Sequence, residues 1–153
     1  MNMRKIIYPA LAAVMFVSVS AHAANETIKI SDVWAWPTVR SAKVGGVYLT
    51  ITNNGSEADR LMSVTTDEAE KVQLRTLSQG SVPQLRDFES GLEIPAGQTV
   101  TLAPDNTHLA LKGLKEPLQK GGEVHLTMQF KKAGTIDVTA NVMARGYTGK
   151  AAQ

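Results

Sequence analysis

The sequence predicts an all-β fold, an antiparallel sandwich or Greek-key barrel built from about nine short strands. In most of the chain, hydrophobic residues alternate with polar residues at a period of two, which is the period of a strand with one buried face. Turn-forming residues such as Gly, Asn and Pro recur roughly every ten residues, a spacing typical of sandwiches and barrels. The period after the first 23 residues is therefore that of strands and not that of helices.

The clearest strand is 124–130, where Val124, Leu126, Met128 and Phe130 share one face and polar residues occupy the other. The same alternation, or a short apolar run between turn residues, predicts eight more strands, at residues 27–33, 47–51, 60–64, 71–77, 84–88, 99–102, 109–111 and 136–142. Segments 67–70 and 115–120 are expected to form single helical turns, and Pro117 limits the second.

The first 23 residues have the three parts of a cleavable signal peptide. Arg4 and Lys5 precede an apolar stretch at residues 6–19, and Ala21-His22-Ala23 offers the small residues that a signal peptidase accepts. We expect cleavage after Ala23, export to the periplasm, one domain at residues 24–144 and a short polar tail at 145–153. No later apolar run approaches the roughly 20 residues of a membrane-spanning helix, so no span is expected in the mature chain.

Composition excludes several classes of function. The chain has 16 basic and 14 acidic residues, and removing Arg4 and Lys5 with the leader leaves no net charge, so nucleic-acid binding is not expected. Because cysteine is absent, neither a disulfide framework nor a thiolate metal site is available. The sequence has no Gly-rich phosphate loop, no Gly-x-Ser-x-Gly and no His-Glu-x-x-His, and only His108 and His125 remain after cleavage. We therefore do not expect an enzyme.

Three sequence blocks point to a known family. Ile94-Pro-Ala-Gly97 and His108-Leu-Ala-Leu-Lys-Gly-Leu114 occur in this order, after the segment Val47-Tyr-Leu-Thr-Ile-Thr-Asn53. Together they resemble the PCu(A)C family of periplasmic copper chaperones, and the resemblance extends from about Ile28 to Val142. It implies a cupredoxin-like fold, Cu(I) as the cargo, and a role in supplying copper to the CuA centre of cytochrome c oxidase, beside an oxidase-assembly or other copper-handling partner.

The copper motif of that family is altered in this chain. The family ligands follow the order His, Met, His, Met, and their positions fall on Arg75, Arg86, His108 and Ala110, with Leu85 as the alternative to Arg86. Cu(I) is soft and prefers thioether sulfur and neutral imidazole, so only His108 is a retained ligand. A guanidinium about 5 Å from Cu(I) costs about 3 kcal/mol at an effective dielectric of about 20. Cu(I) binding is therefore expected to be weak, and no other cofactor is predicted.

A second use of the same cleft is compatible with these residues. Arg75 and Arg86, beside His108, would form a cationic cleft that holds a carboxylate or phosphate through paired N–H donors. In the simpler interpretation both are ordinary exposed strand residues, and His108 caps the loop 105–107. Two functions thus remain open: a copper chaperone with a degenerate site, or a metal-free binding or protein-interaction module. The oligomeric state and the partner stay undetermined.

Other candidate ligands and anchors have simple interpretations. Met128, on an apolar strand face, and Met143 are expected to fill the core, because methionine is a common core residue. His125 lies on the polar face of its strand and is expected at the surface. Of Trp34 and Trp36, one is expected in the core, and the other could lie at a loop tip and contact a partner.

Overall fold

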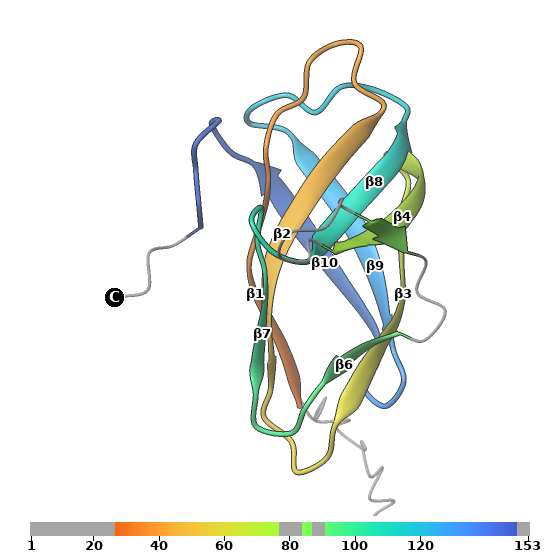
Figure 1. The fold of residues 1–153 in the computed structure, drawn as a ribbon, viewed down its shortest axis with the longest axis vertical. Helices are drawn as coiled ribbons and strands as arrows, with labels where there is room; N and C mark the ends of the chain where they lie inside the picture. Colours follow the sequence, from red (N-terminus) through yellow and green to blue (C-terminus); the bar gives the residue numbers. More distant parts are fainter. Residues whose placement is uncertain (1–26, 77–83, 87–90, 150–153) are drawn as a thin grey trace, which may run out of the picture.

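Ten strands form one curled sheet in the computed structural model, which describes residues 27–76, 84–86 and 91–149 (Figure 1). The strands are β1 (Ile28–Ala35), β2 (Val44–Asn53), β3 (Asp59–Thr66), β4 (Ala69–Thr76), β5 (Gln84–Arg86), β6 (Leu92–Ile94), β7 (Thr99–Leu102), β8 (His108–Leu114), β9 (Glu123–Phe130) and β10 (Gly134–Val142). The expected leader, 1–23, lies outside the described residues. Among the residues described, no helix has the length and hydropathy needed to cross a membrane.

The all-β prediction is confirmed, with one change in strand direction. The strands follow the order β5-β4-β8-β2-β1-β10-β9-β3-β6, and β7 pairs with β2 beside this path. All neighbours are antiparallel except β1 and β10, which run parallel, with Trp34 opposite Asn141 and Ala35 opposite Val142. The purely antiparallel arrangement that we expected is therefore wrong at this one pair. This parallel pair joins the first strand in the sequence to the last strand in the sequence.

The core lies between the two layers of the curled sheet. Figure 1 shows β2 and β8 in front of β9 and β10. In β9 every second residue is buried, from Val124 to Phe130, as the alternating sequence predicts. These side chains meet residues from the front layer such as Leu49 and Leu111, and all of them belong to one hydrophobic cluster. Burial of this apolar surface provides the main driving force for folding.

Sequence patterns missed one strand and predicted two helical turns that are not formed. The missed strand is β6, whose three residues pair with the start of β3. The segment predicted as a helical turn at 67–70 is a bend followed by the first residues of β4, and the segment 115–120 is also irregular. The backbone groups there bond to other segments: Lys115 N–H donates to Glu68 O at 3.1 Å, and Leu118 N–H to Thr38 Oγ1 at 2.9 Å. These long-range bonds replace the bonds of a helical turn.

The buried side chains of Asn53 and Asp59 hold together the turns next to β2, β3 and β6. Asn53 is fully buried; its Nδ2 donates to Glu57 O at 2.8 Å and to Ile94 O at 2.9 Å. The Asp59 carboxylate accepts from the backbone N–H groups of Arg60, Lys132 and Ala133 at 2.7 to 2.9 Å. Each group is buried with its hydrogen bonds made, so it ties neighbouring turns together without a large desolvation penalty.

A bulge in β1 sets the orientation of the strand end that leads to the site. The register with β2 shifts between Ser31 and Trp34, and Asp32 has a φ of 50°. A left-handed conformation is uncommon for a residue other than glycine, although aspartate tolerates it better than most. Bulges re-aim the side chains that follow them. Here the residues that follow are Trp34 and Trp36.

Candidate ligand and metal site around His108

The strand register brings most of the motif positions onto neighbouring strands. Arg75 of β4 is paired with His108 of β8 on one side and with Leu85 of β5 on the other. Arg86 is paired instead with Leu74, one residue along the ladder. Because successive residues of a strand alternate between faces, the backbone places position 85 on the face of Arg75 and position 86 on the opposite face.

The fourth motif position, Ala110, is buried on the same strand face as His108. It lies two residues further along β8 and is paired with Gln73 and Gly46. A Cβ on Gly46 would come within 2.5 Å of Tyr48 Oη and 2.9 Å of its Cζ. The glycine therefore leaves the space that the Tyr48 ring occupies next to the motif positions.

His108 is buried and is held by the loop before β8. The distance from its Nδ1 to Asn106 O is 2.9 Å, and since a carbonyl can only accept, Nδ1 carries a proton. Burial lowers the pKa of His108 below the usual 6.5; hydrogen bonds to the backbone of Asn106 and Ala103 oppose this shift, and the charge of Arg75 adds to it. The ring is thus neutral at pH 7, with its lone pair on Nε2. The contact with Asn106 agrees with the alternative interpretation, in which His108 caps the loop 105–107.

A cluster of aromatic rings adjoins His108. The Tyr48 ring lies 5.3 Å from that of His108, 4.5 Å from Trp34 and 5.6 Å from Trp36. Tyr147, from the segment after β10, packs edge-on against Trp34 at 5.0 Å, and its carbonyl accepts a hydrogen bond from Trp36 Nε1 at 2.7 Å. Of the two tryptophans, Trp34 is buried at 4% exposure and Trp36 is partly exposed. The cluster therefore closes one side of the site.

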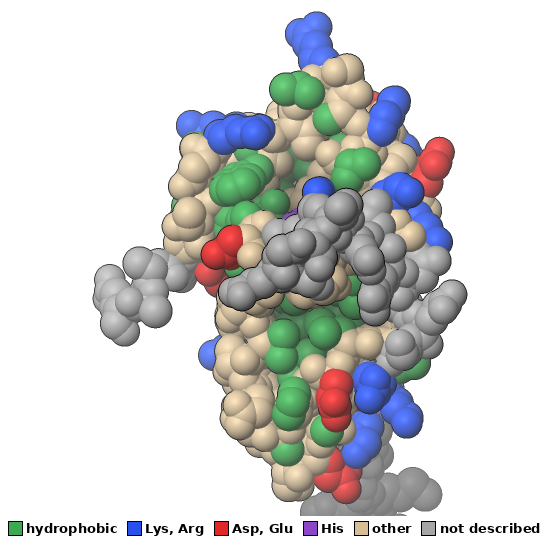
Figure 2. All heavy atoms as spheres, viewed as in Figure 1, with side chains coloured by type: hydrophobic (Ala, Val, Ile, Leu, Met, Phe, Trp, Pro, Cys, Tyr) green, Lys and Arg blue, Asp and Glu red, His purple; other side chains and the backbone are tan. Residues whose placement is uncertain are grey.

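A pocket of about 410 Å³ opens between this cluster and β4 and β8. Its described lining includes the rings of Trp36, Tyr48 and His108 and the side chains of Arg75 and Arg145. No described lining residue carries a carboxylate or a sulfur atom. In Figure 2, a group of hydrophobic side chains in the upper half of this face has Lys and Arg side chains around it. The pocket thus combines apolar walls with positive charge.

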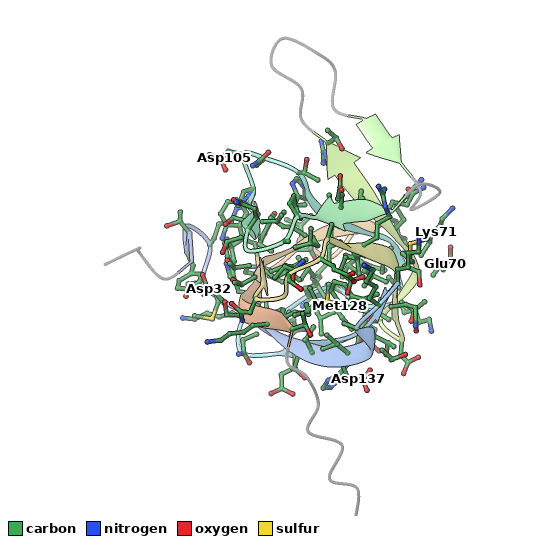
Figure 3. All side chains as sticks on the ribbon, turned by 90° about the horizontal axis from the view of Figure 1, so that it is seen from below. Asp32, Glu70, Lys71, Asp105, Met128 and Asp137 are labelled. Atoms are coloured by element: carbon green, nitrogen blue, oxygen red, sulfur yellow. The ribbon has the colours of Figure 1, made fainter. Side chains whose placement is uncertain are left out.

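The other predicted candidates lie elsewhere. Met128 is fully buried, and Figure 3 shows it in the interior of the sheet, so its expected role in the core is confirmed. His125 is exposed, with its Nε2 3.9 Å from Glu123 Oε2. In the described ranges, no group of three His, Asp or Glu side chains could hold a metal ion. His108, the retained motif ligand, lines the pocket.

Sequence reasoning missed Tyr48, Arg145 and Tyr147 as site residues. Tyr48 had a local signal, because Gly45 and Gly46 precede it and leave space over the strand. Arg145 and Tyr147 lie in the segment that we expected to be a polar tail, and Tyr147 contacts a residue 111 positions away. No local pattern predicts such a contact.

In its described residues the chain is an all-β domain with a buried histidine at the start of β8. The chain belongs to the LpqE-like family, whose model, described as "Putative lipoprotein LpqE-like", matches residues 28–142. It is 30% identical over 109 residues to "Putative lipoprotein Lxx21020" of Leifsonia xyli subsp. xyli, a match that covers 71% of this chain. The match spans 66% of that relative, slightly less than two thirds of its length.

Solved structures with the same fold include copper-binding domains. The copper-bound PCuAC domain from PmoF2 superposes with a TM-score of 0.66 at 24% identity, covering 77% of this chain and 93% of that one. The solution structure of CuI-DR1885 from Deinococcus radiodurans has a TM-score of 0.61 at 28% identity, covering 81% and 85%. The cupredoxin-like architecture inferred from the sequence is confirmed by these superpositions.

Proposed function

We propose that this protein is an exported, non-enzymatic copper-handling protein whose own site holds Cu(I) only weakly, through His108. The likeness to a copper-bound PCuAC domain and to CuI-DR1885 supports copper handling, and the lipoprotein names in the family support export. The leader at 1–23 and a mature domain at 24–144 are part of this proposal. The protein would act in the periplasm beside an oxidase-assembly or other copper-binding partner.

The observation that carries the proposal is the direct pairing of Arg75 with His108 across β4 and β8. His108 offers a neutral imidazole, which is a suitable Cu(I) ligand. Arg75 brings a permanent positive charge to the adjacent position, and at about 5 Å this charge weakens Cu(I) binding by about 3 kcal/mol, roughly a hundredfold. A single imidazole beside a guanidinium is adequate for transient contact with copper but not for storage.

The backbone register also supports Leu85, and not Arg86, as the residue that replaces the first methionine of the motif. Position 85 is paired with Arg75, which is itself paired with His108, so the three positions lie side by side across three strands. Restoring the motif is therefore expected to succeed with methionine at 85 and to fail at 86.

An anaerobic titration against a chromophoric Cu(I) chelator tests these proposals. We expect weak binding by the wild type, and binding at least a hundredfold tighter by a variant carrying Arg75→His, Leu85→Met and Ala110→Met, because the cation is removed and soft donors are added. The matched control keeps Arg75→His and Ala110→Met but carries Arg86→Met in place of Leu85→Met. It should bind Cu(I) less tightly than the first variant. Wild-type affinity equal to that of the restored variant, and lost in His108→Ala, would show that the native site is a competent copper site.

A further inference from the structure

The His108 pocket has the size of a small-molecule site. Its volume of about 410 Å³ falls within the range of about 300–1,000 Å³ found for such sites, and its lining combines aromatic and aliphatic side chains with two arginines and a histidine. Val39 and Val44 also line the pocket and are exposed at 66% and 42%, the two large hydrophobic residues found exposed among the described residues. Trp36 and Tyr48 form the inner wall.

Positive charge is concentrated at the same place from two distant parts of the chain. Arg75 comes from β4 and Arg145 from the segment after β10, and both line the pocket. Both charges also act on the Tyr48 hydroxyl: burial raises the pKa of Tyr48, and Arg75 and then Arg145 lower it in part. The described lining supplies no acidic side chain to neutralise them. A carboxylate placed here would gain charge-assisted hydrogen bonds from guanidinium groups.

His108 favours the same ligand chemistry. The ring is neutral, so it adds no charge, and the lone pair of Nε2 would accept a hydrogen bond from a hydroxyl or a protonated group but not from a carboxylate. Among the described lining residues, Arg75 and Arg145 are therefore the two that carry positive charge. The Trp36 and Val44 side chains, which also line the pocket, offer apolar surface to the body of such a ligand.

We propose that this pocket binds a small organic carboxylate with an aromatic or aliphatic body, the carboxylate lying between Arg75 and Arg145 and the body against Trp36 and Tyr48. This inference rests on the proposed weakness of Cu(I) binding, because an ion held tightly at His108 would occupy the same space. In this proposal Arg145 takes the role that the alternative interpretation of the sequence gave to Arg86.

Intrinsic fluorescence provides a direct assay. The chain has two tryptophans, Trp34 and Trp36, and both belong to the ring cluster at the pocket. Metal-free protein, kept with a chelator, is titrated with phenylacetate, with 2-phenylethanol as the uncharged analogue and with acetate as the charge without the body. We expect saturable binding of phenylacetate, confirmed by calorimetry, with both analogues weaker by on the order of tenfold or more, since each lacks one half of the recognition.

Charge variants identify the site. The double variant Arg75→Gln with Arg145→Gln should weaken phenylacetate binding by on the order of tenfold or more but leave 2-phenylethanol binding unchanged. The matched control, Lys29→Gln with Lys131→Gln, removes two exposed charges from residues outside the pocket lining and should bind as the wild type does.

Three results would overturn the inference: no phenylacetate binding at millimolar concentration, equal weakening in both double variants, or tight binding of a hexaglutamate peptide without binding of phenylacetate. The last result would assign the charged pocket to an acidic protein partner. Because the assay contains no copper, its failure leaves the copper proposal intact, and an unexpectedly tight Cu(I) site would be detected only in the separate copper titration.

Discussion

His108 combines a structural role with a chemical one. Its Nδ1 anchors the loop at Asn106, while its ring lies against Tyr48 and opposite Arg75 in the ladder. Burial and the Arg75 charge both disfavour the protonated ring. Burial and the Arg75 charge thus keep the Nε2 lone pair unprotonated. They also make the stability of the folded state depend on pH in the acid range.

Stability should fall on the acid side of neutrality because of His108. Its pKa is lowered in the folded state, so its contribution is fully present above about 6.5, the usual histidine value, and is lost as the pH falls through the folded pKa. Between the usual pKa and the lowered pKa of the folded state, the unfolded chain takes up a proton that the folded chain does not. The free energy of unfolding therefore falls by at most about 1.4 kcal/mol per pH unit in this range. Urea unfolding at pH 7.5, 6.5 and 5.5 should show this loss in the wild type and a smaller one in His108→Gln. Identical pH profiles for the two proteins would contradict the assignment.

Single residues were predicted well where strand spacing decided their place. Arg75 and His108 were both assigned to positions of the family copper motif, and the register pairs them across β4 and β8. The choice between Leu85 and Arg86 could not be made, since it depends on the length of a connection between two strands. Asp32 was also missed, because a left-handed aspartate in a bulge has no distinct sequence pattern.

At the scale of the strand, β2 is shaped to hold Tyr48 over its own backbone. Gly46 has no Cβ, and the Tyr48 hydroxyl lies only 2.5 Å from the position where a Cβ would be. The Tyr48 ring in turn is enclosed by Trp34, Trp36 and His108 at ring distances of 4.5 to 5.6 Å. The strand therefore cannot accept a larger residue at position 46 without moving the ring cluster.

Gly46→Ala should disrupt the cluster. Its new Cβ would meet Tyr48 Oη at 2.5 Å, and since the ring is buried, relief requires the neighbouring rings to shift. We expect a loss of about 1–3 kcal/mol in the free energy of unfolding, typical of overpacking, with a changed tryptophan emission spectrum. Adding Tyr48→Phe should recover part of the loss, so a double-mutant cycle should give a favourable coupling. Strictly additive effects would show that the two residues do not clash.

The strands themselves were largely predictable, because alternation reports burial on one face. The pattern in β9 is nearly ideal and was identified at its full length but for Glu123. β6 was missed because three residues before Pro95 are too few to show a period. The segments 67–70 and 115–120 were misassigned as helical turns because their backbone partners are distant in the sequence. Residues 77, 87 and 88 of two predicted strands lie outside the described residues.

At the scale of the whole molecule, the segment after β10 completes the site. Met143 N–H donates to Ala35 O at 2.9 Å, which keeps the chain beside β1. Tyr147 then covers Trp34, and its hydroxyl lies 3.5 Å from Asp32 Oδ1. Residues 145–149 thus form part of the domain surface at the pocket, where a short polar tail was expected. Residues 150–153 lie outside the described part of the chain.

Truncation after Ala144 should destabilise the domain and expose the tryptophans. It removes one aromatic pair and the hydrogen bond from Trp36 Nε1, together worth about 1–3 kcal/mol, or several degrees in Tm for a domain of this size. Thermal unfolding and tryptophan emission report the two effects, the second as a red shift. A chain ending at Gly149 is the control and should match the full-length protein. Unchanged Tm and emission in the shorter chain would mean that the segment contributes nothing to packing.

The parallel pairing of β1 with β10 also determines how the molecule faces its surroundings. β1 enters the sheet at Ile28 and leaves it next to Trp36, and eight residues at about 3.3 Å each separate these points by roughly 25 Å. In Figure 1, β1 begins at the lower end of the sheet, and the chain after β10 continues at the upper end. Trp36, which follows β1, and Arg145, which follows β10, both line the His108 pocket, so the pocket lies toward the end of β1 that is remote from Ile28 and receives its ligand from that side.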